Sequence, residues 1–122
     1  MRFVSARLHK ILDYVTIIAF ALAPSVVPLA GLPAIVAYGL AIVHLAVTIA
    51  TAFPATPGRP LPFRAHGGLE TVVGIALLAL PFLAGWNDRA RIFYIVAGAV
   101  ILAVSLVSRY RVDQPSSMGA AV

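Results

Sequence analysis

Four apolar stretches, at roughly residues 11–30, 32–53, 69–86 and 92–108, leave this chain little choice of fold. Each stretch is about 17 to 22 residues long, and a helix rising 1.5 Å per residue needs about 20 to cross a bilayer. Because 61% of the chain is apolar, only 11% is charged and the mean hydropathy is +1.00, a soluble globule is excluded. Backbone groups in a bilayer must bond internally, and the stretches lack the alternation of barrel strands. The sequence therefore predicts an all-α integral membrane protein with four transmembrane helices.

The sequence also contains an internal repeat. Residues 9–53 and 66–110 align without a gap at an offset of 57, and 11 of the 45 aligned positions are identical. The matches include Pro24 with Pro81, which shared apolar composition does not explain. We predict a single membrane domain over residues 1–122, built as two tandem, pseudo-symmetric helical hairpins. The intervening residues 54–65 are rich in proline and are predicted to form an extended linker, and residues 113–122 a disordered tail.

The basic residues predict an orientation in the membrane. Two of the nine, Arg89 and Arg91, follow the third apolar stretch, and the other seven fall on the opposite side. The positive-inside rule then places both termini in the cytoplasm. Basic residues scattered at helix ends fit membrane anchoring better than nucleic-acid binding. The chain has no cysteine, which excludes disulfides and thiolate metal sites.

A histidine and a carboxylate stand four residues apart in each repeat: His9 with Asp13, and His66 with Glu70. This spacing places both side chains on one face of a helix, near its predicted cytoplasmic entrance. If the hairpins pack around a pseudo-twofold axis, the two pairs can face each other and hold a divalent metal ion, relay protons or bind a polar headgroup. The alternative is that they are separate helix caps and interfacial anchors.

His44 is the third candidate, because it lies among apolar residues about nine positions before Phe53. An imidazole this far inside an apolar membrane-spanning stretch must face protein or water rather than lipid. Its repeat equivalent is Ile101, so the repeat is not symmetric there. His44 is predicted either to bond a neighbouring hydroxyl or carbonyl group, or to serve as a ligand, haem or proton-relay residue. A single histidine at this depth gives little support to a bis-histidine haem.

Hydroxyl residues also recur in both repeats, with Thr48 and Thr51 matching Ser105 and Ser108. We assign these four residues to helix packing, since hydroxyls bond across close helix contacts in membranes. The chain shows no nucleophile elbow, phosphate loop or zinc-protease motif, so catalytic residues are not predicted and an enzyme is not favoured.

The stretch Leu80-Pro81-Phe82-Leu83-Ala84-Gly85-Trp86, followed after a short polar turn by Ile92-Phe93-Tyr94-Ile95-Val96-Ala97-Gly98, resembles the SPW-repeat family of small bacterial membrane proteins. The resemblance covers both repeats and implies helical-hairpin repeats in a bacterial cytoplasmic membrane. It implies no substrate.

Three classes of function remain open. The first is an accessory, scaffolding or self-associating subunit, as a homo-oligomer or within a larger membrane complex. The second is a binder of a small ligand, quinone, haem or metal ion that uses His44 with the paired histidines and carboxylates. The third is a proton or solute pathway through the same residues.

Overall fold

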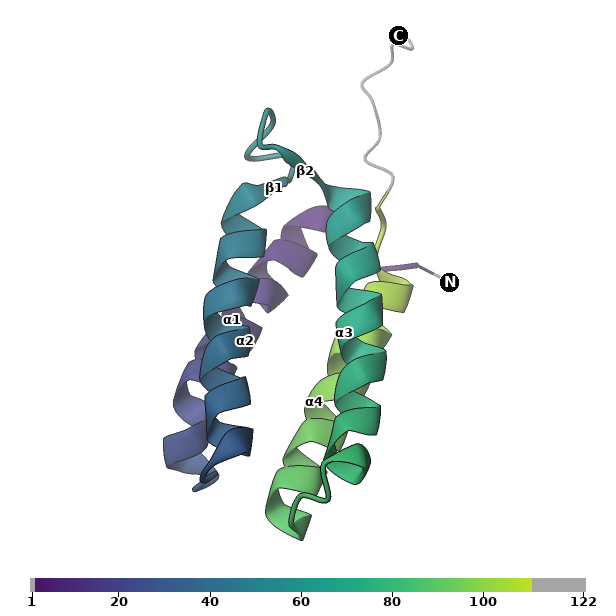
Figure 1. Ribbon diagram of the computed structural model, residues 1–122. Helices are drawn as coiled ribbons and strands as arrows, with labels where there is room; N and C mark the ends of the chain where they lie inside the picture. The colour runs from purple at the N-terminus through teal and green to yellow at the C-terminus, as the bar shows by residue number, and fades with distance from the viewer. Residues whose placement is uncertain (1, 111–122) are drawn as a thin grey trace, which may run out of the picture.

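The computed structural model describes residues 2–110 and is all-helical apart from two very short strands (Figure 1). The predicted tail, residues 113–122, lies outside the described residues. The elements in chain order are α1 (Ala6–Val26), α2 (Leu32–Ala50), β1 (Thr51–Ala52), β2 (Leu61–Pro62), α3 (Phe63–Leu83) and α4 (Asp88–Val107). The predicted all-α fold with four long apolar helices is confirmed.

Each helix is long and apolar enough to cross a membrane. The four contain 19 to 21 residues, and their most apolar windows have mean hydropathies of 1.3 to 2.3. Large apolar side chains cover their outer faces: Ile18, Ile42, Val72 and Ile92 are each more than half exposed. Such a surface fits lipid better than water, which is consistent with an integral membrane protein.

Three helices begin earlier than hydropathy predicts, and one of them is α4, which begins at Asp88. Helix α1 starts at Ala6, where the Ser5 hydroxyl accepts a hydrogen bond of 3.1 Å from the Leu8 amide, and α3 starts at Phe63. The predicted starts at residues 11, 69 and 92 were wrong because hydropathy marks the apolar span, whereas the helical backbone continues through the polar residues before it. The predicted linker 54–65 is shorter for the same reason, since its last residues form β2 and the start of α3.

The helices form two antiparallel hairpins, with α1 packed on α2 and α3 packed on α4 (Figure 1). Gly74 and Gly98 bring α3 and α4 close together: a Cβ on Gly98 would lie 2.9 Å from the Gly74 carbonyl oxygen. At the end of the bundle that holds the α1–α2 turn, the buried Tyr94 hydroxyl donates a hydrogen bond of 2.6 Å to the Pro33 carbonyl. This bond joins the second hairpin to the first.

Parallel backbone pairing joins the hairpins at the other end. Thr51 pairs with Leu61 through β1 and β2, and Val4 pairs with Ser108 in an isolated bridge. Thr51 and Ser108 each follow the end of a helix, and their partners Leu61 and Val4 each lie just before the start of one. The two pairs are equivalent in the repeat, because their residues are 57 positions apart. This pairing gathers the starts of α1 and α3 and the ends of α2 and α4.

Candidate functional site

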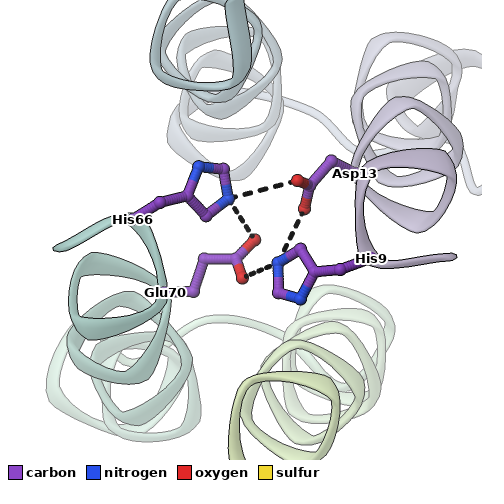
Figure 2. Close-up of side chains that lie close together, drawn as sticks. All are labelled: His9, Asp13, His66 and Glu70. Carbon is purple, nitrogen blue, oxygen red and sulfur yellow. Dashed lines mark ion pairs between the residues drawn. The ribbon is translucent and has the colours of Figure 1, made fainter. Parts of the chain in front are cut away.

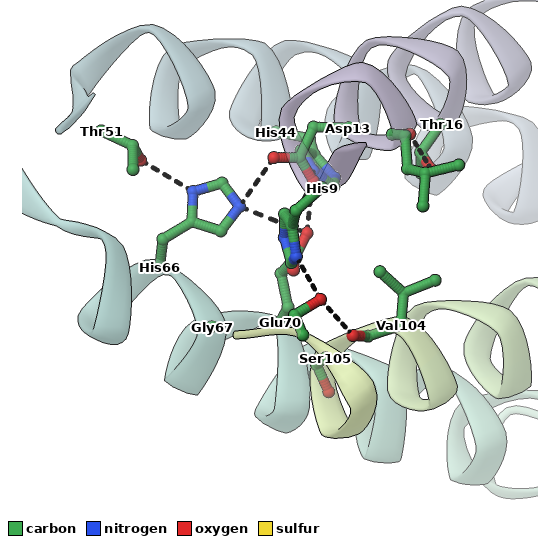
Figure 3. Close-up of polar contacts among 12 residues, drawn as sticks. His9, Asp13, Thr16, His44, Thr51, His66, Gly67, Glu70, Val104 and Ser105 are labelled. Carbon is green, nitrogen blue, oxygen red and sulfur yellow. Dashed lines mark hydrogen bonds and ion pairs between the residues drawn. The ribbon is translucent and has the colours of Figure 1, made fainter. Parts of the chain in front are cut away.

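All five candidate residues from the sequence meet in one cluster inside this end of the bundle. Helix α1 contributes His9 and Asp13, α3 contributes His66 and Glu70 from the facing side, and α2 contributes His44 (Figures 2 and 3). The side chains of His9 and His66 are fully buried, and that of His44, the most exposed of the five, is 12% exposed. These ionisable groups therefore lie in the interior, away from bulk water.

The Nε2 atom of every histidine lies close to both carboxylates. His9 Nε2 is 3.4 Å from Asp13 and 2.7 Å from Glu70. His66 Nε2 is 3.2 Å from Asp13 and 3.3 Å from Glu70, and His44 Nε2 is 3.2 and 3.1 Å from the same two groups. The two carboxylates are thus shared between the hairpins.

The other ring nitrogen of His9 and of His66 is held by a hydroxyl group. His9 Nδ1 lies 2.7 Å from Ser108 Oγ, which donates its own hydrogen to the Val104 carbonyl at 2.6 Å. His66 Nδ1 lies 2.7 Å from Thr51 Oγ1, which donates to the Val47 carbonyl at 2.6 Å (Figure 3). Because each hydroxyl hydrogen is already used, Nδ1–H must be the donor. A neutral ring then presents the Nε2 lone pair to the centre of the cluster.

Four atoms at this centre are buried without a hydrogen-bond partner within residues 2–110. They are His9 Nε2, His66 Nε2, Asp13 Oδ2 and Glu70 Oε1. Each of the four residues offers one atom that can ligate a metal ion, and these ligand atoms all lie within 4.8 Å of one another. Their close approaches have the distances but not the directions of hydrogen bonds. Figure 2 shows these groups pointing toward one another from α1 and α3.

Aromatic rings cover the cluster at the end where the strands lie. Phe63 packs against His9 at 5.0 Å between ring centroids, Phe53 packs against His66 at 5.7 Å, and Tyr110 packs against both His9 and Phe63. Phe53 and Phe63 are almost fully buried. Burial raises the pKa of Tyr110 to about 12, and the negative charge of Glu70 adds to the effect. This aromatic lid, Phe53, Phe63 and Tyr110, separates the cluster from water.

The prediction that the two pairs can face each other agrees with this geometry, and the capping alternative does not. Neither α1 nor α3 has an acidic residue in its first turn, because both helices begin earlier than predicted. His44 contacts the same carboxylates, Asp13 and Glu70, and within residues 2–110 it does not bond the hydroxyl or carbonyl group that the alternative required.

The sequence interpretation missed the residues that surround the cluster. Thr51 and Ser108 were assigned to helix packing, yet each holds a histidine ring. A signal was present, because these hydroxyl positions recur at the same offset of 57 as His9 and His66. The aromatic lid had a weaker signal in the match of Phe53 with Tyr110.

Comparison with known proteins gave no match: no protein-family model, curated protein or solved structure shows significant similarity to this chain. The resemblance to SPW-repeat proteins therefore stays a prediction.

Proposed function

We propose that this protein binds one divalent transition-metal ion inside the membrane through His9, Asp13, His66 and Glu70. The observation that carries the proposal is the set of four buried donor atoms, one from each residue, that converge without hydrogen-bond partners among the described residues. Buried polar groups in proteins are nearly always satisfied, so a set of unpaired groups that converge at one point indicates a cation-binding site.

The spacing of the ligands supports a tetrahedral ion. In a Zn²⁺ site with bonds of about 2.05 Å, neighbouring ligand atoms lie about 3.3 Å apart. Of the four unpaired atoms, His66 Nε2 and Asp13 Oδ2 lie 3.2 Å apart, which is close to this spacing. The contact of 2.7 Å between His9 and Glu70 is shorter and must lengthen when the ion binds.

Charge gives a second argument. With neutral histidines, Asp13 and Glu70 place two negative charges in an interior where an unpaired charge is costly. A divalent cation makes the cluster neutral. Imidazole nitrogen with carboxylate oxygen suits Zn²⁺, Fe²⁺ or Mn²⁺ better than Mg²⁺, which keeps water and prefers oxygen ligands alone.

The hydroxyl groups complete the centre. Metal-bound histidines almost always donate their second N–H to a neighbouring acceptor, which fixes the ring orientation. Ser108 and Thr51 have this role for His9 and His66.

We also propose that the two hairpins arose by duplication, that both termini are cytoplasmic, and that the membrane is a bacterial cytoplasmic membrane. The equivalent contacts at an offset of 57 support the first of these, and the distribution of basic residues supports the second.

Metal analysis of the purified protein tests the proposal. After the protein is loaded with Zn²⁺ and desalted, we expect elemental mass spectrometry to find about one Zn²⁺ ion per chain. Asp13→Asn and Glu70→Gln should each weaken Zn²⁺ binding, and the double variant should lose less than the sum because neighbouring ligands couple by about 0.5 to 3 kcal/mol. Asp88→Asn is the control, because that carboxylate side chain is 90% exposed. A wild type that retains no Zn²⁺ would contradict a metal centre. So would a loss of Zn²⁺ affinity in the control Asp88→Asn as large as in Asp13→Asn and Glu70→Gln.

A second candidate is an accessory subunit that associates with itself or with a larger membrane complex. The observation that favours it is the exposure of helix α2. Only 17% of the most apolar segment of this helix is buried inside the protein, so most of its surface is free to contact a partner. Native mass spectrometry from membranes should then show a homo-oligomer or a stable complex. A monomer without a partner would exclude this role and leave the metal proposal unaffected.

A further inference from the structure

A cavity opens beside the cluster, between α2 and α3. Its volume is about 170 Å³, and its walls are apolar, with Val43, Leu69 and Val73 among them, except for His44 and Glu70. Among the described residues, the titratable groups that line this cavity are therefore two members of the cluster.

In a bilayer spanned by these helices, the mouth of this cavity would face the hydrocarbon. Val43 and Leu69 line it and are 59% and 47% exposed on the outer surface of helices that are long enough to span a membrane. The aromatic lid meanwhile covers the cluster at the end with the strands. A molecule that reaches His44 through this opening must therefore be soluble in lipid.

With the proposed cation bound to the two carboxylates, His44 is neutral and presents a free acceptor to such a molecule. Its Nε2 lies within 3.2 Å of oxygens of both Asp13 and Glu70, and since a carboxylate accepts, Nε2–H is the donor. In the neutral ring Nδ1 then carries a lone pair, and it has no hydrogen-bond partner in the part of the chain that the structure describes. The complementary group is a hydroxyl that donates.

The volume limits the size of the molecule. A cavity of about 150 Å³ lined by apolar side chains accepts benzene, so 170 Å³ accommodates one six-membered ring. We propose that this cavity binds a lipid-soluble molecule with a phenolic head, such as a hydroquinone, whose ring lies among the apolar side chains and whose hydroxyl donates to His44 Nδ1. This inference rests on the proposed metal centre, because the carboxylates that bind the ion also orient His44.

The pseudo-symmetric position supplies a natural comparison. A second cavity of about 260 Å³ lies between α1 and α4, and it includes Val100 and Ile101, the equivalents of Val43 and His44. None of the described residues that line it is titratable. The hydroxyl-binding feature is thus confined to the α2–α3 side.

Fluorine NMR with para-fluorophenol tests the proposal on Zn²⁺-loaded protein in nanodiscs. The wild type should bind this probe saturably, and para-fluoroanisole, which has no hydroxyl, should bind about tenfold more weakly, as should para-fluorophenol to His44→Leu. Val43→Trp fills the cavity and should abolish saturable binding while Zn²⁺ is retained. Val100→Trp, the matched control, should bind like the wild type.

The outcomes separate the two proposals. A wild type that holds no Zn²⁺ refutes the metal centre. A Zn²⁺-loaded wild type that does not bind para-fluorophenol saturably refutes only the phenol site, as does an equal effect of Val43→Trp and Val100→Trp. Equal affinities for the phenol and the anisole refute the hydrogen bond to His44.

Discussion

Removal of the Ser108 hydroxyl should weaken metal binding without touching a ligand. Ser108 is fully buried, and its Oγ accepts from His9 Nδ1 at 2.7 Å. The variant Ser108→Ala deletes this acceptor and leaves Nδ1–H unpaired in the interior. The ring of His9 is then free to rotate or to move its proton to Nε2, the nitrogen proposed to bind the ion.

Two independent estimates of the magnitude agree. A buried donor left without a partner costs about 1 to 3 kcal/mol. Loss of a group that orients a metal-bound histidine typically costs 10- to 100-fold in affinity, which corresponds to about 1.4 to 2.8 kcal/mol. We therefore expect Ser108→Ala to raise the Zn²⁺ dissociation constant by 10- to 100-fold.

Competition with a chromophoric zinc chelator measures this change in detergent-solubilised protein. Ser105→Ala is the matched control: Ser105 is also buried on α4, but its hydroxyl bonds the Leu102 carbonyl and Thr71 instead of a histidine. The control should bind Zn²⁺ within about twofold of the wild type. If both variants lose the same affinity, the hydroxyl acts through general stability and the assigned role of Ser108 is wrong.

Four further predictions concern the scaffold and its orientation. Gly98→Ala should destabilise the protein by about 1 to 3 kcal/mol in thermal or denaturant unfolding, because the new Cβ would lie 2.9 Å from the Gly74 carbonyl oxygen. Gly39→Ala, with nothing within 4 Å of its Cβ, should be neutral or stabilising, and equal losses would contradict the close approach of α3 and α4. Tyr94→Phe should cost about 0.5 to 1.5 kcal/mol of unfolding free energy through loss of its bond to Pro33, and an unchanged melting curve would argue against that link. Tyr110 has a raised pKa of about 12, so it stabilises the fold below its unfolded pKa of about 10, and this contribution is lost as the pH rises toward 12. In Tyr110→Phe the loss of stability between these pH values should be smaller, and identical pH profiles would refute the assignment. In this cysteine-free chain, Arg64→Cys should react with an impermeant thiol reagent only from the cytoplasmic side and Asn87→Cys only from outside, and the reverse pattern would invert the topology.

The sequence was sufficient for the architecture because a membrane restricts the choices. Long apolar stretches in a bilayer must satisfy their backbone internally, which leaves helices, and the spacing of His9 with Asp13 and of His66 with Glu70 fixes their shared faces. The depth of these pairs was harder to predict. Hydropathy located the apolar span but not the polar first turn of α1 or α3, so the pairs were expected nearer the surface than they lie.

The remaining parts of the site depend on contacts between distant residues. His9 and Ser108 are separated by 99 positions, and His44 meets Asp13 across 31. Neither contact has a local pattern. The first depends on how the two hairpins dock through the paired backbone at Val4 and Ser108 and at Thr51 and Leu61, and the second depends on the register of α1 against α2 within the first hairpin. The periodicity of one helix specifies a face, whereas the register between hairpins is set by packing.

His44 is the residue whose presence stability alone does not explain. At the equivalent place in the second hairpin, Ile101 is buried, and an apolar side chain requires no hydrogen-bond partner. His44 instead lines an apolar cavity, and in the proposed site its Nδ1 is an acceptor, whose burial without a partner costs about 1 to 3 kcal/mol. The carboxylates do not require a third histidine either, because His9 and His66 already contact both of them. A molecule that bonds Nδ1 from the lipid side would offset this cost, so the asymmetry between His44 and Ile101 points to the α2–α3 cavity as the side from which the centre is used.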